Sequence, residues 1–202
     1  MMKQFKLGLI INPVAGLGGS VGLKGSDNVT EQALALGAEP KSHKRTQAAL
    51  EVLLPYKEQI QIFTPSGKMG QTLAEEMGFA TQVVLTVGEH TSPADTELTV
   101  KTLIEQGVDL ILFAGGDGTA RNVCSAVSDN TTVLGIPAGC KIHSGVYAIT
   151  PKAAGRVVEM LINGELVTLS DADVMDIDES AFREGVVKAK RYGEMQVPSE
   201  FM

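Results

Sequence analysis

One short stretch, Gly115-Gly116-Asp117-Gly118-Thr119, combines residues suited to binding phosphate with one that could transfer a proton. Its glycines permit close backbone approaches that side chains forbid, and Thr119 offers a hydroxyl that can also cap a helix. Asp117 places a carboxylate among amides suited to an anion. That placement makes sense if a divalent cation intervenes, or if the carboxylate takes a proton from a hydroxyl during phosphoryl transfer. A third alternative is that Asp117 only caps a helix.

The residues around this stretch predict the elements that would position it. An apolar run at 110–114 precedes it, and apolar residues at helical spacing follow it from Ala120 to Val127. The pattern predicts a strand, a glycine turn and a helix. In an open α/β sheet, ligands bind beyond the carboxyl ends of strands, and the N–H groups of a helix N-terminus attract anions. We therefore expect a phosphorylated ligand at this turn.

Two further loops have the composition of ligand-binding segments. After a predicted strand at 5–11, the segment 15–26 places five glycines around Lys24. Their spacing matches neither the Walker motif nor the dinucleotide-binding motif, so a surface loop without a ligand is the alternative; the position after the first strand favours binding. After a predicted strand at 132–136, the segment 137–145 again combines glycines with polar residues.

The turn Thr64-Pro65-Ser66-Gly67 repeats the order of strand, small polar turn and helix. The strand is predicted at 59–63 and the helix at 68–77. Ser66 is predicted to cap this helix, and a hydrogen bond from its hydroxyl to a ligand is the alternative. The sequence thus contains two turns of similar local pattern.

The alternation of strands and helices up to residue 165 predicts the fold class. The sequence also predicts a strand at 81–87 and helices at 30–36, 43–54, 94–106 and 151–163. The helix at 94–106 is predicted to be capped by Thr91 or Ser92. We expect an α/β protein with a doubly wound, mainly parallel, Rossmann-like sheet over residues 1–165. Residues 166–202 contain strand-like pieces without crossover helices. They predict the beginning of a β-rich second domain, too short to close a core of its own.

Composition excludes several classes of function. The formal net charge is −7 and no block of Lys and Arg occurs, which argues against a nucleic-acid partner. The short apolar run near the N-terminus ends at Asn12-Pro13, so it predicts a strand instead of a signal peptide or a membrane span. The two cysteines, Cys124 and Cys140, form no metal-ligand or disulfide pattern. We expect a cytoplasmic protein without a membrane partner.

Three segments together carry a family resemblance: INPVAGLGGSVGLKGSD, FAGGDGTARNV and LGIPAGCKIHSGVYA. In this order and spacing the chain resembles the ATP-NAD kinase family, in particular its AcoX-like branch, within the wider NAD kinase and diacylglycerol kinase superfamily. The resemblance extends from Lys6 to about Glu184. It implies a kinase that transfers a phosphoryl group from ATP to a hydroxyl, expected to be the 2′-hydroxyl of NAD, giving NADP. A kinase of another small hydroxyl compound or lipid alcohol, and a non-catalytic nucleotide sensor, are the alternatives.

The resemblance also implies roles for individual residues. Asp117 would be catalytic, as the base toward the hydroxyl that receives the γ-phosphoryl group. The residues expected to bind the nucleotide or its phosphates are Asn12, Gly16, Gly18, Gly19, Lys24, Gly115, Gly116, Gly118, Thr119, Pro137, Gly139, Lys141, His143 and Ser144. Mg²⁺ is expected with ATP and NAD as substrates, and no residue is assigned as its ligand. Asn122 stands where close relatives carry an acid. The run 173–179 occupies roughly the place of a later acidic motif of the family, but most of its carboxylates are expected to lie in a solvated turn.

Members of this family continue into an all-β domain that supplies much of the dinucleotide pocket. Residues 166–202 would therefore be an incomplete second domain, in a fragment or in a shortened relative. As partners we expect small-molecule nucleotides and further copies of the same chain in a homo-oligomer.

Overall fold

A parallel sheet forms the centre of the molecule. The computed structural model describes residues 4–15, 41–128, 130–138, 142–165, 168–177 and 189–199. Its sheet has the strand order β3-β2-β1-β4-β5, with parallel pairing throughout. The strands are β1 (Phe5–Ile11), β2 (Ile60–Pro65), β3 (Ala80–Leu85), β4 (Leu110–Gly115) and β5 (Val133–Pro137). The predicted α/β fold class is confirmed.

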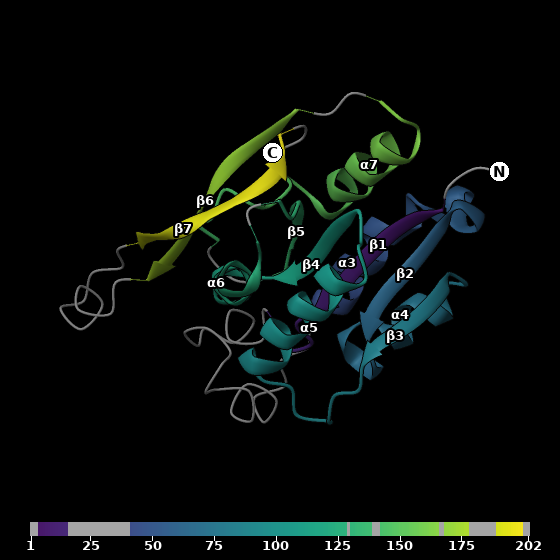
Figure 1. Cartoon of the computed structure of the whole chain (residues 1–202), viewed down its shortest axis with the longest axis horizontal. Helices are drawn as coiled ribbons and strands as arrows, with labels where there is room; N and C mark the ends of the chain where they lie inside the picture. The colour runs from purple at the N-terminus through teal and green to yellow at the C-terminus, as the bar shows by residue number, and fades with distance from the viewer. Residues whose placement is uncertain are drawn as a thin grey trace.

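Helices cover both faces of this sheet (Figure 1). One face is covered by α3 (Ser42–Glu51), α4 (Gln71–Glu76) and α7 (Pro151–Ile162), and the other by α5 (Pro93–Glu105) and α6 (Asp117–Ala126). Alternate residues of a strand point to opposite faces, so Leu7 and Leu9 pack with α3 and α7, whereas Ile10 packs with α5 and α6. Continuous apolar strands such as 110–114 are therefore buried on both sides, as in doubly wound sheets.

The predicted helix at 68–77 is wrong in detail. A 3₁₀-helix, η2 (Gly67–Met69), ends at Gly70, where the α-helix α4 begins. A Cβ on Gly70 would lie 1.7 Å from Thr64 Oγ1, so only glycine fits between the turn and the strand. Ser66 occupies the N-cap position of η2, but its side chain makes no capping hydrogen bond. Its hydroxyl instead accepts a hydrogen bond from the backbone N–H of Val87 at 2.8 Å.

The cap predicted at Thr91 or Ser92 is confirmed at Ser92. The side chain of Asp95 accepts the backbone N–H of Ser92 at 2.9 Å, forming one half of a capping box, and Pro93 occupies the first helical position. A second 3₁₀-helix, η1 (Leu54–Gln59), follows α3 and leads into β2.

The C-terminal strands form an antiparallel ribbon of β6 (Leu169–Ile177) and β7 (Ala189–Pro198). Figure 1 shows it beyond the β5 end of the sheet and next to α6. Its Val174, Met195 and Val197 are buried in the same cluster as Val123 of α6. The ribbon therefore shares the core between the sheet and α6, while the predicted domain boundary at residues 165 and 166 stays a prediction.

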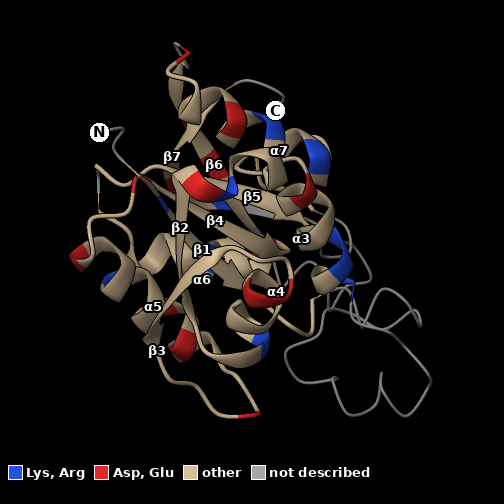
Figure 2. Cartoon of the chain, turned by 90° about the vertical axis from the view of Figure 1, so that its right-hand side faces the viewer, with Lys and Arg blue, Asp and Glu red and all other residues tan. Residues whose placement is uncertain are grey.

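Some predictions fall outside the described residues, namely the helix at 30–36 and the binding residues Gly16, Gly18, Gly19, Lys24, Gly139 and Lys141. In the view of Figure 2, acidic and basic residues both lie spread over the helices around the sheet. None of the helices formed by the described residues is long and apolar enough to span a bilayer.

Candidate functional site

The ends of β1, β4 and β5 lie side by side at the carboxyl edge of the sheet. The backbone N–H of Asn12 donates to the carbonyl of Ala114 at 2.9 Å, and that of Ala138 donates to the carbonyl of Gly115 at 2.9 Å. In the order β3-β2-β1-β4-β5, β1 and β4 are the pair from which the chain winds outward in opposite directions. This topological switch point is where open α/β sheets bind their ligands.

The turn after β4 fits closely against the first turn of α6. A Cβ on Gly115 would lie 2.2 Å from Thr119 Oγ1, so a side chain at this position would displace Thr119. Thr119 Oγ1 in turn accepts a hydrogen bond from Asn12 Nδ2 at 3.0 Å. Asn12 and Thr119, predicted separately from two sequence segments, therefore meet and join the end of β1 to α6.

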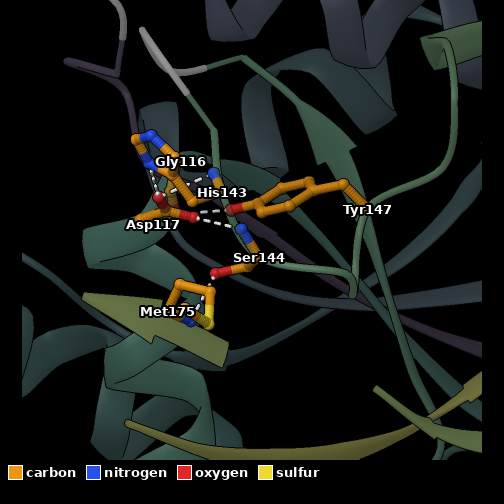
Figure 3. A network of polar contacts seen from close by, with 6 residues as sticks. All are labelled: Gly116, Asp117, His143, Ser144, Tyr147 and Met175. Atoms are coloured by element: carbon orange, nitrogen blue, oxygen red, sulfur yellow. Dashed lines mark hydrogen bonds and ion pairs between the residues drawn. The ribbon is translucent and has the colours of Figure 1, made fainter. Parts of the chain in front are cut away.

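Asp117 opens α6 but does not cap it. The N-cap is Gly116, which has no side chain, and the N–H groups of the first helical turn have no acceptor within the helix. The Asp117 carboxylate instead accepts two backbone N–H groups from the connection between β5 and α7. His143 donates to Oδ2 at 2.8 Å and Ser144 to Oδ1 at 2.9 Å (Figure 3). The partners of this carboxylate thus come from far along the chain.

The imidazole of His143 also contacts Asp117. Its Nδ1 lies 3.1 Å from Asp117 Oδ2. Because a carboxylate can only accept, Nδ1 carries the hydrogen in this contact, and in a neutral ring Nε2 then has a lone pair. The Asp117 side chain is 11% exposed and that of His143 is 35% exposed. The carboxylate is therefore enclosed, whereas the ring reaches solvent.

The loop that contacts Asp117 is held from its other side by the ribbon. Ser144 Oγ accepts the backbone N–H of Met175 in β6 at 2.8 Å, and the N–H of Gly145 donates to the carbonyl of Asp173 at 2.8 Å. Asp173 itself pairs with Arg191, whose Nε lies 3.1 Å from Oδ1, and both side chains are more than half exposed. The acidic run expected as a solvated turn is thus strand β6 as far as Ile177.

Tyr147 was not singled out in the sequence, yet it belongs to this site. Its hydroxyl donates to the carbonyl of Gly116 (Figure 3), and its ring meets Phe113 edge to face at 5.4 Å. Burial, and to a lesser extent the charge of Asp117, raises the pKa of Tyr147 well above its usual value. One feature of the sequence could have pointed to a bulky neighbour here, namely Gly135, because a glycine inside a strand often marks a place where another group packs against the backbone. A Cβ on Gly135 would lie 2.4 Å from the Tyr147 ring.

Of the residues predicted to bind the nucleotide or to catalyse, those that the structure describes all lie at this carboxyl edge of the sheet. Asn12 follows β1, the segment 115–119 joins β4 to α6, Pro137 ends β5 beside Gly115, and His143 and Ser144 contact Asp117. Among the described residues, no group of three or more His, Cys, Asp or Glu side chains could hold a metal ion. N–H donors on both oxygens of Asp117 favour a carboxylate that accepts hydrogen bonds over one that binds a cation.

Comparisons with known proteins identify a family model and a solved structure to which this chain is similar. The family model described as the ATP-NAD kinase N-terminal domain matches residues 7–166. A search of curated proteins gives no match. A solved structure from Bacillus anthracis str. Sterne, described as a candidate diacylglycerol kinase, is similar with a TM-score of 0.46 and 18% identity, covering 99% of this chain and 67% of that chain.

Proposed function

Since the match over residues 7–166 shows that the chain belongs to the ATP-NAD kinase family, we propose that it transfers the γ-phosphoryl group of ATP to the 2′-hydroxyl of NAD. The family supports a kinase-type phosphotransferase. The choice of NAD as acceptor is our proposal. It is supported by the position of the site at the switch point of the sheet, where nucleotides bind in folds of this type.

A single observation supports the chemistry most directly. Asp117 stands at the N-terminus of α6, beside first-turn N–H groups that have no acceptor within the helix. Such amides and the helix dipole attract phosphate. The same turn therefore offers a place for the phosphates and, directly beside it, a carboxylate for the hydroxyl that attacks. On this basis we propose that Asp117 is the catalytic residue, as the sequence predicts.

Mg²⁺ is proposed as the companion of the ATP phosphates. Such ions keep several waters and use few protein ligands, which is compatible with a site whose described residues form no cluster of metal ligands. When bound, the ion would neutralise charge on the transferred group. The expectations of a homo-oligomer and of a cytoplasmic location stay predictions.

The test is an assay of the intact protein with ATP, Mg²⁺ and NAD, in which NADP is measured with an NADP-specific dehydrogenase. We expect NADP formation, and a fall in kcat of roughly 100-fold or more in Asp117→Asn, as for loss of proton transfer. Asp171→Asn, at an exposed position of β6, is the matched control and keeps wild-type activity.

Two outcomes would contradict the proposal in different ways. ADP release with other hydroxyl acceptors but not with NAD would retain the kinase and replace the acceptor. Tight binding of ATP or NAD in calorimetry without transfer to any offered acceptor would instead identify a nucleotide sensor.

A further inference from the structure

The hydroxyl of Tyr147 contacts the turn at which the phosphates of ATP are proposed to bind. We propose that Tyr147 is a positioning residue for ATP: by holding the Gly116 carbonyl, its hydroxyl directs the N–H of Asp117 out of α6, toward the phosphates. This inference rests on the proposed function, because it takes from it the place of the ATP phosphates. It concerns the backbone of the turn and leaves the role proposed for the Asp117 carboxylate unchanged.

The carbonyl of Gly116 accepts two hydrogen bonds. The N–H of Ala120 donates to it at 3.0 Å, as the first hydrogen bond of α6, and the Tyr147 hydroxyl donates to it from the connection after β5 (Figure 3). Because Ala120 lies one turn into the helix, the carbonyl points along α6, away from its N-terminus. The hydroxyl of Tyr147 holds the carbonyl in this direction from a second side.

The direction of this carbonyl fixes the direction of an N–H group. The carbonyl of Gly116 and the N–H of Asp117 belong to one peptide unit, and the described residues contain no cis peptide bond. In a trans peptide the C=O and N–H bonds point in opposite directions. The N–H of Asp117 therefore points out of the N-terminus of α6, where the helix offers it no acceptor. Anions bind to a helix N-terminus from this direction.

The turn has no side chain of its own that could hold this peptide unit in place. The N-cap of α6 is Gly116, and glycine has more conformational freedom than any other residue. Freedom that a site loses when its ligand binds lowers the affinity. A hydrogen bond that fixes the peptide unit before ATP binds reduces this loss. The hydroxyl of Tyr147 supplies such a hydrogen bond.

Tyr147 is itself held in a fixed position. The N–H of Gly135 in β5 donates to the carbonyl of Val146 at 2.9 Å, and the N–H of Ala148 donates to the carbonyl of Gly135 at 3.0 Å, so β5 binds the backbone on both sides of Tyr147. The ring lies where a Cβ on Gly135 would be and packs edge to face on Phe113. The residue is only 7% exposed. The hydroxyl is therefore positioned by packed groups on several sides.

The direction of the hydrogen bond is also fixed. Burial raises the pKa of Tyr147 well above its usual value, so the hydroxyl keeps its hydrogen at neutral pH. A carbonyl oxygen can only accept, and the phenol is therefore the donor in the contact with Gly116. Replacing Tyr147 by Phe would remove this donor and keep the ring.

Calorimetry with ATP and Mg²⁺ measures the contribution of the hydroxyl. In Tyr147→Phe we expect the Kd for ATP to rise by roughly fivefold, the effect of losing one neutral hydrogen bond. The matched control is Tyr56→Phe. The hydroxyl of Tyr56 donates to Glu159 at 2.9 Å, and its helix η1 precedes β2, at the amino edge of the sheet opposite the site. This control also loses one tyrosine hydrogen bond and should bind ATP as the wild type does.

A second measurement follows the N–H group itself and begins with the wild type. In backbone-assigned ¹H–¹⁵N spectra of the full chain, the amide proton of Asp117 should move to lower field when ATP and Mg²⁺ are added, because it gains a phosphate acceptor. At saturating ATP this shift should be smaller in Tyr147→Phe. In phosphoryl transfer, the same variant should raise KM for ATP and leave KM for NAD unchanged, a separation that a general loss of stability would not produce.

The outcomes separate this inference from the proposed function. An unchanged Kd for ATP in Tyr147→Phe, or an Asp117 amide proton that ATP does not move, would overturn the inference and leave the kinase intact. Equal losses of affinity in Tyr147→Phe and Tyr56→Phe would also overturn it. If the wild type shows the expected binding but transfers phosphate to no acceptor, the proposed function fails and this inference stands. If the wild type does not bind ATP, both fail.

Discussion

Two turns of the molecule have the same local pattern, and only one of them has the features of a site. After β2 and after β4, a strand ends at small polar residues and a helix follows. In both turns a glycine lies against a threonine hydroxyl, Gly70 against Thr64 and Gly115 against Thr119. The pattern of strand, glycine turn and helix therefore describes how a chain can turn closely, and by itself it does not identify a binding site.

The difference lies in the groups that other segments bring to each turn. After β2, Thr64 Oγ1 donates to the carbonyl of Leu9 and Ser66 Oγ accepts one N–H from Val87, so neutral groups satisfy one another. After β4, a carboxylate receives N–H groups and an imidazole from the connection after β5. The second turn therefore differs from the first in two ways: it contains the charged side chain of Asp117, and it lies at the switch point, where β1, β4 and β5 end side by side.

The largest expected effect tests the similarity of the two turns. Gly115→Ala and Gly70→Ala should each lower the free energy of unfolding by about 3 kcal/mol, because the new methyl group would overlap a threonine side chain in a packed turn. Denaturant unfolding measures this. Gly88→Ala, where a Cβ meets nothing within 4 Å, is the control and should be nearly neutral. Equal stability of Gly115→Ala and Gly88→Ala would contradict the close fit of the β4 turn.

The next effect tests the difference between the turns. In Asp117→Ala, hydrogen exchange of the His143 and Ser144 amides should accelerate by roughly 100-fold, because each loses a hydrogen bond to a charged group worth about 1.5–3 kcal/mol. Site-resolved hydrogen exchange measures it, with Asp171→Ala as control. Unchanged protection of both amides would show that the connection after β5 is held without Asp117.

A smaller effect is expected at the other turn. Ser66→Ala should accelerate exchange of the Val87 amide by roughly fivefold, because a neutral hydrogen bond contributes about 1 kcal/mol. The same variant should keep wild-type phosphoryl transfer. A loss of turnover without a loss of stability would mean that Ser66 contacts the ligand, and the contrast between the turns would no longer hold.

The smallest effect concerns Tyr147 and appears only in alkali. Its pKa is raised in the folded state, so the unfolded chain loses the phenolic proton first, at about pH 10, and stability falls as the pH rises above that value. In a titration followed by tyrosinate absorbance, Tyr147 should ionise only together with unfolding. Tyr147→Phe should remove this late step and flatten the alkaline loss of stability. If the rise in tyrosinate absorbance on unfolding is unchanged in Tyr147→Phe, it comes from another tyrosine and the prediction is contradicted.

Much of the fold could be predicted because its signals are local. Apolar runs such as 110–114 predict strands buried on both faces, and Ser92 with Pro93 predicts a helix start. The helix expected at 68–77 is present only over 71–76, because Gly70 lies against Thr64 and a 3₁₀ turn precedes it. Helical periodicity does not show this contact between the turn and the preceding strand. The strand-like pieces after residue 166 predicted β structure, but their pairing as one ribbon packed on α6 depends on contacts across the chain.

The sequence by itself determined which residues at this site have reactive chemistry: the carboxylate of Asp117, the hydroxyl of Thr119 and the imidazole of His143. Only the tertiary structure decided what each of them contacts. Asp117 was open to three interpretations, and it accepts hydrogen bonds from residues 26 and 27 positions away instead of capping its helix. The physical reason is that a polar group in a turn is satisfied by whichever partners the strand order places beside it, and strand order is a property of the whole sheet.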